Sequence, residues 1–141
     1  MLLSKRKVKD QTPEAIQYRG VDIQIENGIG SIRNGIDAGG QAWQTKFFYP
    51  YGFIIGVKGI DGEELDCFVG NDEPSPNVYV INQIKHDGHY IDEQKVMFGF
   101  NSAIRARDAY LAHFNTQGYL GTVDEIPFDK YKQQLDLILN K

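Results

Sequence analysis

The chain has 141 residues, of which 41% are hydrophobic, and its formal net charge is −4. This length fits one domain with a core of its own, and the acidic balance argues against general nucleic-acid binding, which needs an excess of Lys and Arg. A single cysteine, Cys67, excludes an intramolecular disulfide and a cysteine-based zinc site, and its apolar neighbours indicate a small core residue.

The start of the chain is basic and polar and shows no periodicity. We predict a mobile arm over residues 1–17 and a domain over residues 18–141. No apolar stretch reaches transmembrane length, and the first residues lack the apolar core of a signal peptide. We therefore expect no membrane partner and a cytoplasmic protein, or a virion component if a phage encodes it.

Short strands are predicted from residue 21 onward. Alternating apolar and polar residues predict a strand over 21–26, and Asn27-Gly28 predicts a hairpin turn into a second strand over 29–33. A second turn, at 37–40, leads into a segment rich in aromatic and β-branched residues. Later strand-like segments, NVYVINQI and HYIDEQKVMFGF, are separated by the turn signal His86-Asp87-Gly88.

The pattern changes after Phe100, where two helices are predicted. Asn101 or Ser102 can cap the first, which runs to residue 115 and carries an apolar stripe of Ile104, Leu111 and Phe114. The second runs from about 128 to 139, with one face formed by Phe128, Tyr131, Leu135 and Ile138. The predicted fold is mainly β (α+β), a small OB-like β-barrel with two C-terminal helices.

Three carboxylates are crowded into the segment IDGEELDCFVG. Asp61 and Glu63 share one side of an extended chain, and Asp66 joins them only if the chain turns between them, which Gly62 permits. Converging carboxylates repel one another unless a cation neutralises them, and oxygen ligands suit Mg²⁺ or Mn²⁺. The alternative is a charged hairpin turn with Asp-Gly at its tip.

A second acidic group lies around the third predicted turn. Asp87 and Asp92 could approach each other across the hairpin, and Lys95 could reach an anion that metal ions hold. The alternative is a solvated hairpin with an incidental lysine.

The segments FYPYGFIIGVKGIDGEELDCFVG, KVMFGF and SAIRARDAYLAHF resemble soluble family I inorganic pyrophosphatases. They are closer still to the small pyrophosphatase-like domain of phage and mobile-element proteins, over roughly Tyr18 to Leu139. The resemblance implies metal-dependent hydrolysis of inorganic pyrophosphate, or a related phosphoanhydride, by in-line attack of a metal-activated water. It implies Mg²⁺ as cofactor, with Mn²⁺ as a second candidate, and a homo-oligomer or a virion partner as candidate assemblies.

The resemblance also implies roles for single residues. The catalytic residues that it implies are Glu63 and Tyr51. Glu63 takes the position of the residue that activates the water, and Tyr51 takes the position of a tyrosine that contacts a phosphate. The substrate ligands it implies are Arg33, Tyr51 and Lys95, and the metal ligands are Asp61, Glu63, Asp66, Asp87 and Asp92. Glu26 is a further acidic candidate and Lys132 a further basic one.

Two departures from the family pattern concern the site itself. Glu63 replaces an aspartate, which lengthens the side chain by one methylene. Lys95 follows Asp92 by three positions, where the family has two, so its side chain points to the other face of a strand. Either a bulge corrects this, or Glu93 and Lys95 form the functional pair. The departures motivate the alternative of a catalytically degenerate binding or structural module, and a nucleotide-phosphate hydrolase is a third hypothesis.

Overall fold

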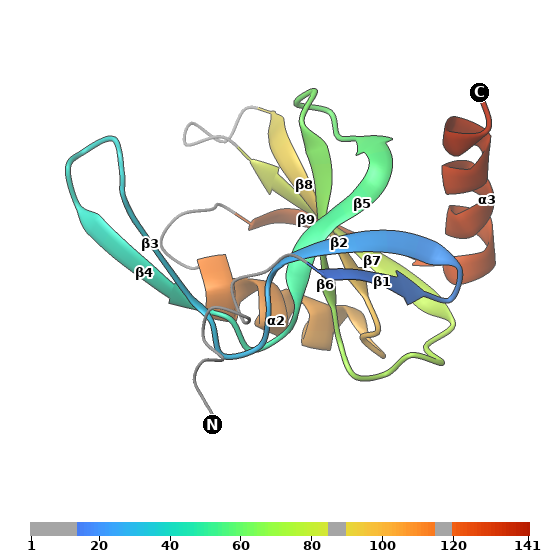
Figure 1. Ribbon diagram of the computed structural model, residues 1–141, viewed down its shortest axis with the longest axis horizontal. Helices are drawn as coiled ribbons and strands as arrows, with labels where there is room; N and C mark the ends of the chain where they lie inside the picture. Colours follow the sequence, from blue (N-terminus) through green and yellow to red (C-terminus); the bar gives the residue numbers. More distant parts are fainter. Residues whose placement is uncertain (1–13, 85–89, 115–119) are drawn as a thin grey trace.

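The computed structural model describes residues 14–84, 90–114 and 120–141. Its strands are β1 (Glu14–Tyr18), β2 (Val21–Asn27), β3 (Ile32–Ile36), β4 (Ala42–Lys46), β5 (Tyr51–Lys58), β6 (Glu64–Val69), β7 (Asn77–Ile84), β8 (Ile91–Phe98) and β9 (Leu120–Pro127). Its helices are α2 (Ala103–Phe114) and α3 (Phe128–Leu139). Figure 1 shows a curled sheet with the two helices packed against it and a long β3–β4 hairpin that projects from the body.

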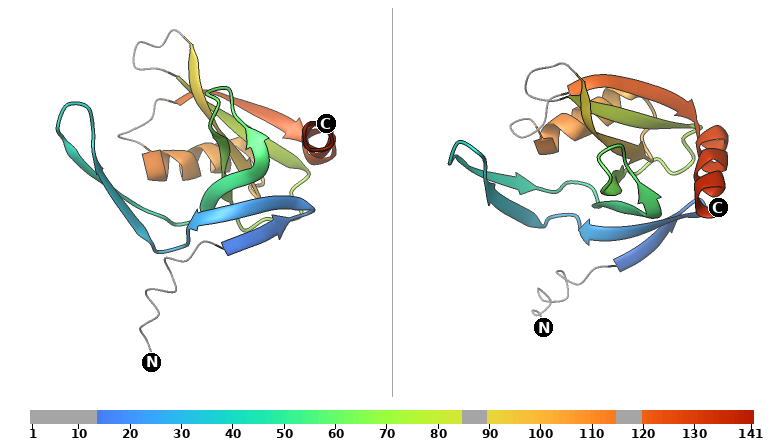
Figure 2. Two further views of the ribbon diagram at one scale, coloured as in Figure 1. Left: turned by 45° about the horizontal axis from the view of Figure 1, so that its top comes forward. Right: turned by 90° about the horizontal axis from the view of Figure 1, so that it is seen from above.

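Within these residues, seven strands form one sheet in the order β1-β2-β5-β6-β8-β7-β9. β6 and β8 run parallel, whereas the other neighbouring strands run antiparallel. The sheet curls but stays open, because its edge strands β1 and β9 do not pair with each other (Figure 2). The prediction of a mainly-β fold with two helices late in the chain is therefore confirmed, whereas the predicted closure into a barrel is wrong.

The first predicted hairpin is also wrong. β2 pairs with β1 and β5, whereas β3 pairs with β4 in a separate two-stranded sheet. The chain leaves the main sheet after Asn27 through a turn in which Ser31 N–H donates to the Gly28 carbonyl. The next predicted turn is confirmed, because the Asp37 carboxylate accepts hydrogen bonds from the N–H groups of Gly39 and Gln41 and closes the β3–β4 hairpin.

Two edge strands were not predicted. β1 begins at Glu14, so the last residues assigned to the arm belong to the sheet, while residues 1–13 lie outside the described residues and their mobility stays a prediction. β9 pairs with β7 and lies between the two helices in the sequence, where no strand was predicted. Both strands have one neighbour and many exposed side chains, so neither carries a strong apolar alternation.

The two helices cover opposite faces of the sheet. Successive residues of a strand point to opposite sides, so neighbouring residues pack against different helices. Cys67 belongs to the apolar cluster that includes Phe128 of α3, whereas the next residue, Phe68, belongs to the cluster that includes Tyr110 of α2. Cys67 is completely buried, which confirms its prediction as a small core residue. Among the described residues, no helix is long and apolar enough to cross a membrane.

The predicted helix bounds agree with α2 and α3, but the predicted faces agree only in part. Ile104 of α2 is 69% exposed, and Ile138 of α3 is 45% exposed. The buried face of α2 is instead formed by Ala106, Ala109, Tyr110, His113 and Phe114. Small alanines allow the helix to lie close to the sheet, and a search for large apolar side chains overlooks such a face.

His113, in the last turn of α2, joins this helix to the segment between β4 and β5. Its Nε2 accepts a hydrogen bond from the Phe48 N–H at 3.0 Å, and its Nδ1 donates to the Ala109 carbonyl at 2.6 Å. Both ring nitrogens are thus used by a neutral imidazole that carries its proton on Nδ1. Burial lowers the pKa of His113, although the Ala109 carbonyl acts in the opposite direction.

We therefore expect His113 to make the fold sensitive to acid. Its pKa in the folded state lies below the ordinary value of about 6.5, so between these two values the unfolded state binds more protons. The free energy of unfolding then decreases as the pH falls through about 6.5. Urea unfolding of wild type and His113→Gln between about pH 5 and pH 8 tests this. The variant should be less stable at high pH and should lose less stability on acidification; equal acid sensitivity would contradict the expectation.

Candidate active site

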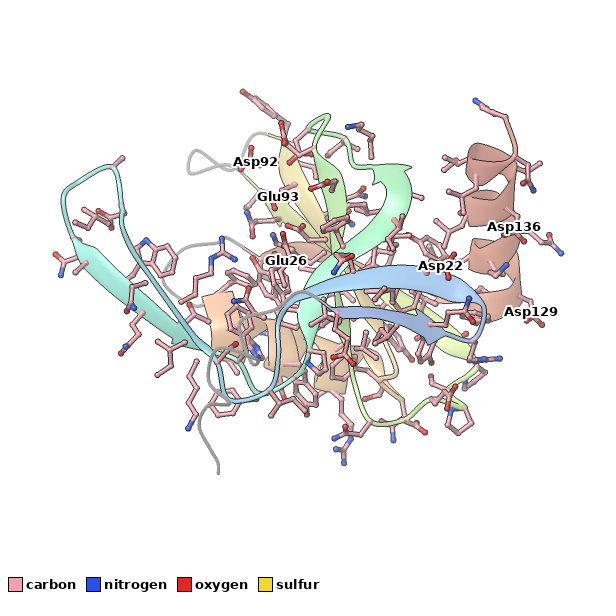
Figure 3. The ribbon with its side chains drawn as sticks, viewed as in Figure 1. Asp22, Glu26, Asp92, Glu93, Asp129 and Asp136 are labelled. Atoms are coloured by element: carbon pink, nitrogen blue, oxygen red, sulfur yellow. The ribbon has the colours of Figure 1, made fainter. Side chains whose placement is uncertain are left out.

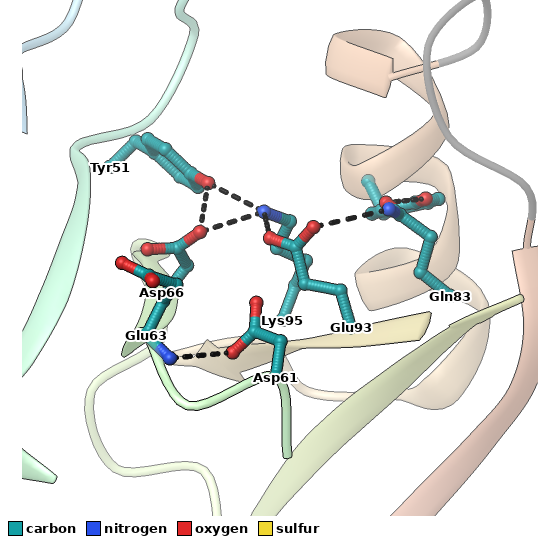
Figure 4. Close-up of polar contacts among 8 residues, drawn as sticks. Tyr51, Asp61, Glu63, Asp66, Gln83, Glu93 and Lys95 are labelled. Atoms are coloured by element: carbon teal, nitrogen blue, oxygen red, sulfur yellow. Dashed lines mark hydrogen bonds and ion pairs between the residues drawn. The ribbon is translucent and has the colours of Figure 1, made fainter. Parts of the chain in front are cut away.

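A polar pocket of ≈ 290 Å³ lies where the main sheet, the β3–β4 hairpin and α2 meet. Its lining side chains come from six strands and one helix of the described chain: Glu26 (β2), Arg33 (β3), Tyr51 (β5), Asp66 (β6), Gln83 (β7), Glu93 and Lys95 (β8), and Phe114 (α2). The pocket therefore unites six of the residues that the sequence singled out, which are Glu26, Arg33, Tyr51, Asp66, Glu93 and Lys95. Figure 4 shows the polar contacts at its centre.

The pairing register of the strands explains why these side chains share one face. Asp66 of β6 lies directly opposite Lys95 of the parallel strand β8. Glu93 precedes Lys95 by two positions and therefore projects to the same side, and Gln83 of β7 lies directly opposite Glu93. Tyr51 reaches the same face from the start of β5. Strand pairing thus gathers groups that lie far apart in the chain.

The ammonium group of Lys95 is the centre of the contacts (Figure 4). Its Nζ donates to Tyr51 Oη and to Asp66 Oδ2, both at 2.8 Å, and to Glu93 Oε2 at 2.5 Å. Tyr51 Oη in turn donates to Asp66 Oδ2 at 2.8 Å. The Lys95 side chain is only 5% exposed, whereas the side chains of Asp66 and Glu93 are 24% and 29% exposed. A nearly buried cation thus faces two carboxylates that still reach solvent.

The surroundings fix the protonation of these groups. Burial by itself would lower the pKa of Lys95, but Tyr51, Asp66 and Glu93 raise it above its ordinary value, so Lys95 stays charged. Burial raises the pKa of Tyr51, with Lys95 acting in the opposite direction, so the phenol stays neutral and can donate. Burial also raises the pKa of Glu93, which Lys95 again opposes.

Glu26 adds a third carboxylate to the pocket walls. Burial raises its pKa, and the nearby carboxylates of Asp66 and Glu64 raise it further. Clustered, partly buried carboxylates are less costly when a cation neutralises them, and their oxygens are the ligands that Mg²⁺ takes. The donor chemistry of the pocket therefore fits a divalent metal. Over the described ranges, however, no three Asp, Glu, His or Cys side chains are grouped closely enough to hold one ion.

The turn before β6 has the shape that the sequence predicted. Gly62 has a φ of 83°, and its N–H donates to the Gly59 carbonyl at 3.1 Å. Asp61 Oδ1 accepts a hydrogen bond from the Glu63 N–H at 3.0 Å, so Asp61 also serves the turn, as the charged-turn alternative requires. Neither Asp61 nor Glu63 lines the pocket. Figure 4 shows the hydrogen bond between the Asp61 carboxylate and the Glu63 N–H. Their metal-binding and water-activating roles stay predictions.

The second acidic group is described only in part, so the approach of Asp87 to Asp92 and their roles as metal ligands stay predictions. Asp87 lies outside the described residues. Asp92 sits at an irregularity in the β7–β8 pairing and does not line the pocket, whereas Glu93 lines it and forms an ion pair with Lys95. The ion pair agrees with the second alternative that the Lys95 spacing left open, and its functional role stays a prediction. In the sequence, the two-residue spacing of Glu93 and Lys95 indicates this pairing, because it places both side chains on one face of a strand.

The remaining candidates differ in position. Glu26 lies in the pocket, whereas Lys132 forms an ion pair with Asp136 along α3. Figure 3 shows Glu26 and Glu93 in the central part of the molecule and Asp136 on the helix at its side. Gln83 and Phe114 are pocket residues that sequence reasoning missed, because nothing in the local pattern distinguishes them from other strand and helix residues.

A comparison with protein-family models matches residues 6–136 to inorganic pyrophosphatase. A search of curated proteins gives no match.

The buried ammonium should contribute strongly to stability. Lys95→Met keeps most of the apolar stem but leaves Asp66 and Glu93 without their cation. Removing one partner of a buried pair costs about 3–5 kcal/mol, and the partial exposure of the carboxylates favours the lower end. Lys132→Met is the matched control, because its pair with Asp136 is a partly exposed i,i+4 pair worth about 0.5 kcal/mol. Urea unfolding followed by circular dichroism measures both, and equal losses would contradict the expectation.

Proposed function

The chain belongs to the inorganic pyrophosphatase family, and on that premise we propose that it hydrolyses inorganic pyrophosphate with a divalent metal ion. The observation that carries the proposal is the composition of the pocket. Carboxylates of Glu26, Asp66 and Glu93 face the same ≈ 290 Å³ as the cations of Arg33 and Lys95. Carboxylates suit a hard metal, and the cations suit a phosphate that the metal binds.

Mg²⁺ is the proposed cofactor, with Mn²⁺ as the second candidate. The pocket carboxylates Asp66, Glu93 and Glu26 are the candidate ligands of one ion, and the acidic residues predicted from the sequence, Asp61, Glu63, Asp87 and Asp92, would bind further ions. When bound, the metal lowers the pKa of a water molecule and neutralises charge on the phosphate oxygens.

The chain's own groups would bind and orient the substrate. Arg33 presents a planar guanidinium from the β3–β4 hairpin, which suits two oxygens of one phosphate. Lys95 has three N–H donors, and these contact Tyr51, Asp66 and Glu93. A phosphate oxygen would therefore replace one of these acceptors. The neutral phenol of Tyr51 can donate to the same phosphate.

The reaction is a transfer of one phosphoryl group to water. The water oxygen forms a bond to one phosphorus in line with the bridging oxygen, and the bond from that phosphorus to the bridging oxygen breaks. Glu63 accepts the proton that the water loses, and the second phosphate leaves with the bridging oxygen. The longer side chain of Glu63 must place its carboxylate within hydrogen-bond reach of the water.

The alternative function is a pyrophosphatase-like module without catalysis, a binding or structural protein such as a phage accessory or virion component. The contacts of Lys95 favour it, because this ammonium already neutralises Asp66 and Glu93 where a metal would bind. A nucleotide-phosphate hydrolase remains the third hypothesis. Closeness to the phage domain, a cytoplasmic or virion location and the oligomeric state stay predictions.

Asp66→Asn should abolish most phosphate release from pyrophosphate in the presence of Mg²⁺. The change keeps the shape of the side chain but removes a carboxylate charge that the proposed metal ion needs, and without the metal the water keeps its high pKa. The matched control is Asp22→Asn, because Asp22 is an exposed β2 carboxylate that accepts from Gln17. A phosphate assay measures all three proteins. Equal release by wild type and Asp66→Asn would contradict the proposal, and absence of Mg²⁺ binding by wild type in calorimetry would favour the inactive module.

A further inference from the structure

Two polar side chains that the proposed reaction does not use lie in a row behind Glu93. Tyr110 Oη of α2 donates to Gln83 Oε1 of β7 at 2.7 Å, and Gln83 Nε2 donates to Glu93 Oε1 at 3.4 Å. Tyr110 is completely buried and Gln83 is 8% exposed. Figure 4 shows the contact of Gln83 with Glu93 beside the contacts of Lys95. A chain of hydrogen bonds thus runs from the helix along the face of the sheet that it covers to the pocket.

The direction of this chain is set by Glu93. An ionised carboxylate can only accept hydrogen bonds, so the NH₂ group of the Gln83 amide must face Glu93. The amide carbonyl then faces Tyr110, whose hydroxyl must donate to it. Burial raises the pKa of Tyr110 to about 12, although Lys95 acts in the opposite direction, so the hydroxyl keeps the proton that it donates. Each group in the row thus fixes the orientation of the next one.

Both carboxylate oxygens of Glu93 accept a hydrogen bond in this arrangement. Oε1 accepts from Gln83, and Oε2 accepts from Lys95. A carboxylate has about four lone-pair positions, so each oxygen keeps one for a further partner in the pocket. The backbone supports the same geometry, because Gln83 lies directly opposite Glu93 in the β7–β8 pairing.

We propose that Tyr110 and Gln83 are positioning residues that hold the Glu93 carboxylate in the orientation the pocket needs for a divalent metal. The inference rests on the proposed function, because it assigns Glu93 to the metal site. Groups that orient a metal ligand in this way commonly change metal affinity by about 10- to 100-fold when they are removed. The competing explanation is that the row only satisfies buried polar atoms, in which case its loss lowers stability and leaves metal binding unchanged.

Tyr110→Phe tests the proposal, because it removes the hydroxyl and keeps the buried ring. Tyr18→Phe is the matched control, since Tyr18 is also a buried core tyrosine and its hydroxyl donates to the Glu73 carbonyl at 2.7 Å, away from the pocket residues. Three measurements apply to wild type and both variants. They are the Mg²⁺ dissociation constant from calorimetry with the metal alone, the thermal midpoint, and the position of the Glu93 carboxylate in metal-free crystal structures.

The expected result is a Mg²⁺ affinity about 10- to 100-fold weaker for Tyr110→Phe, with a rotated Glu93 carboxylate. Tyr18→Phe should lower only the thermal midpoint. An unchanged affinity and an unmoved Glu93 in Tyr110→Phe would overturn the positioning role. If wild type binds no Mg²⁺, the proposed function fails. The crystal structures then decide whether Tyr110 and Gln83 orient the Glu93 carboxylate. A rotated Glu93 then still supports the positioning role, and an unmoved Glu93 overturns it.

Discussion

The ion pairs of Lys95 with Asp66 and Glu93 are the interaction on which the pocket depends. They exist because β6 and β8 are parallel neighbours with Asp66 opposite Lys95. An ammonium that is 5% exposed would be costly without anionic partners, and two carboxylates on one face would repel each other without a cation. The three charges therefore stabilise one another, and any metal or phosphate that enters must exchange with contacts already present.

The elements around this centre give the pocket its walls. α2 lies close to the sheet through small alanines, and its Phe114 closes one side of the pocket. The same helix carries Tyr110, which contacts the pocket through Gln83. The β3–β4 hairpin leaves the main sheet and contributes Arg33. Both polar and apolar walls thus come from elements that are separated along the chain.

The structure bears differently on the two departures from the family pattern. The spacing of Lys95 from Asp92 is explained, because Glu93 is its acidic partner and the two residues share a strand face. Whether the Lys95 spacing argues for a degenerate site therefore depends on whether Glu93 and Lys95 are the functional pair. The substitution at Glu63 remains an argument for a degenerate site. The position of the Lys95 ammonium between two carboxylates is a second argument for it. The choice between an enzyme and an inactive module therefore depends on whether a metal can enter beside Lys95.

Most elements could be predicted from the sequence, because their signals are local. The alternation of β2, the bounds of α2 and α3, the turn at Gly62 and the buried Cys67 follow from patterns within a few residues. The edge strands were missed, since a strand with one neighbour and exposed side chains shows little alternation. The predicted apolar face of α2 was right at Phe114 and wrong at Ile104, because the buried face depends on what the helix packs against.

The sequence by itself determined the residue types of the candidate site and the crowding of carboxylates before β6. Only the tertiary structure decided which of them meet. The partner of each strand, the open edge of the sheet and the choice of Glu93 over Asp92 in the pocket depend on pairing between segments far apart in the chain. The sequence of a strand determines which of its side chains share a face. Its register against a distant neighbour is set by the packing of the whole sheet.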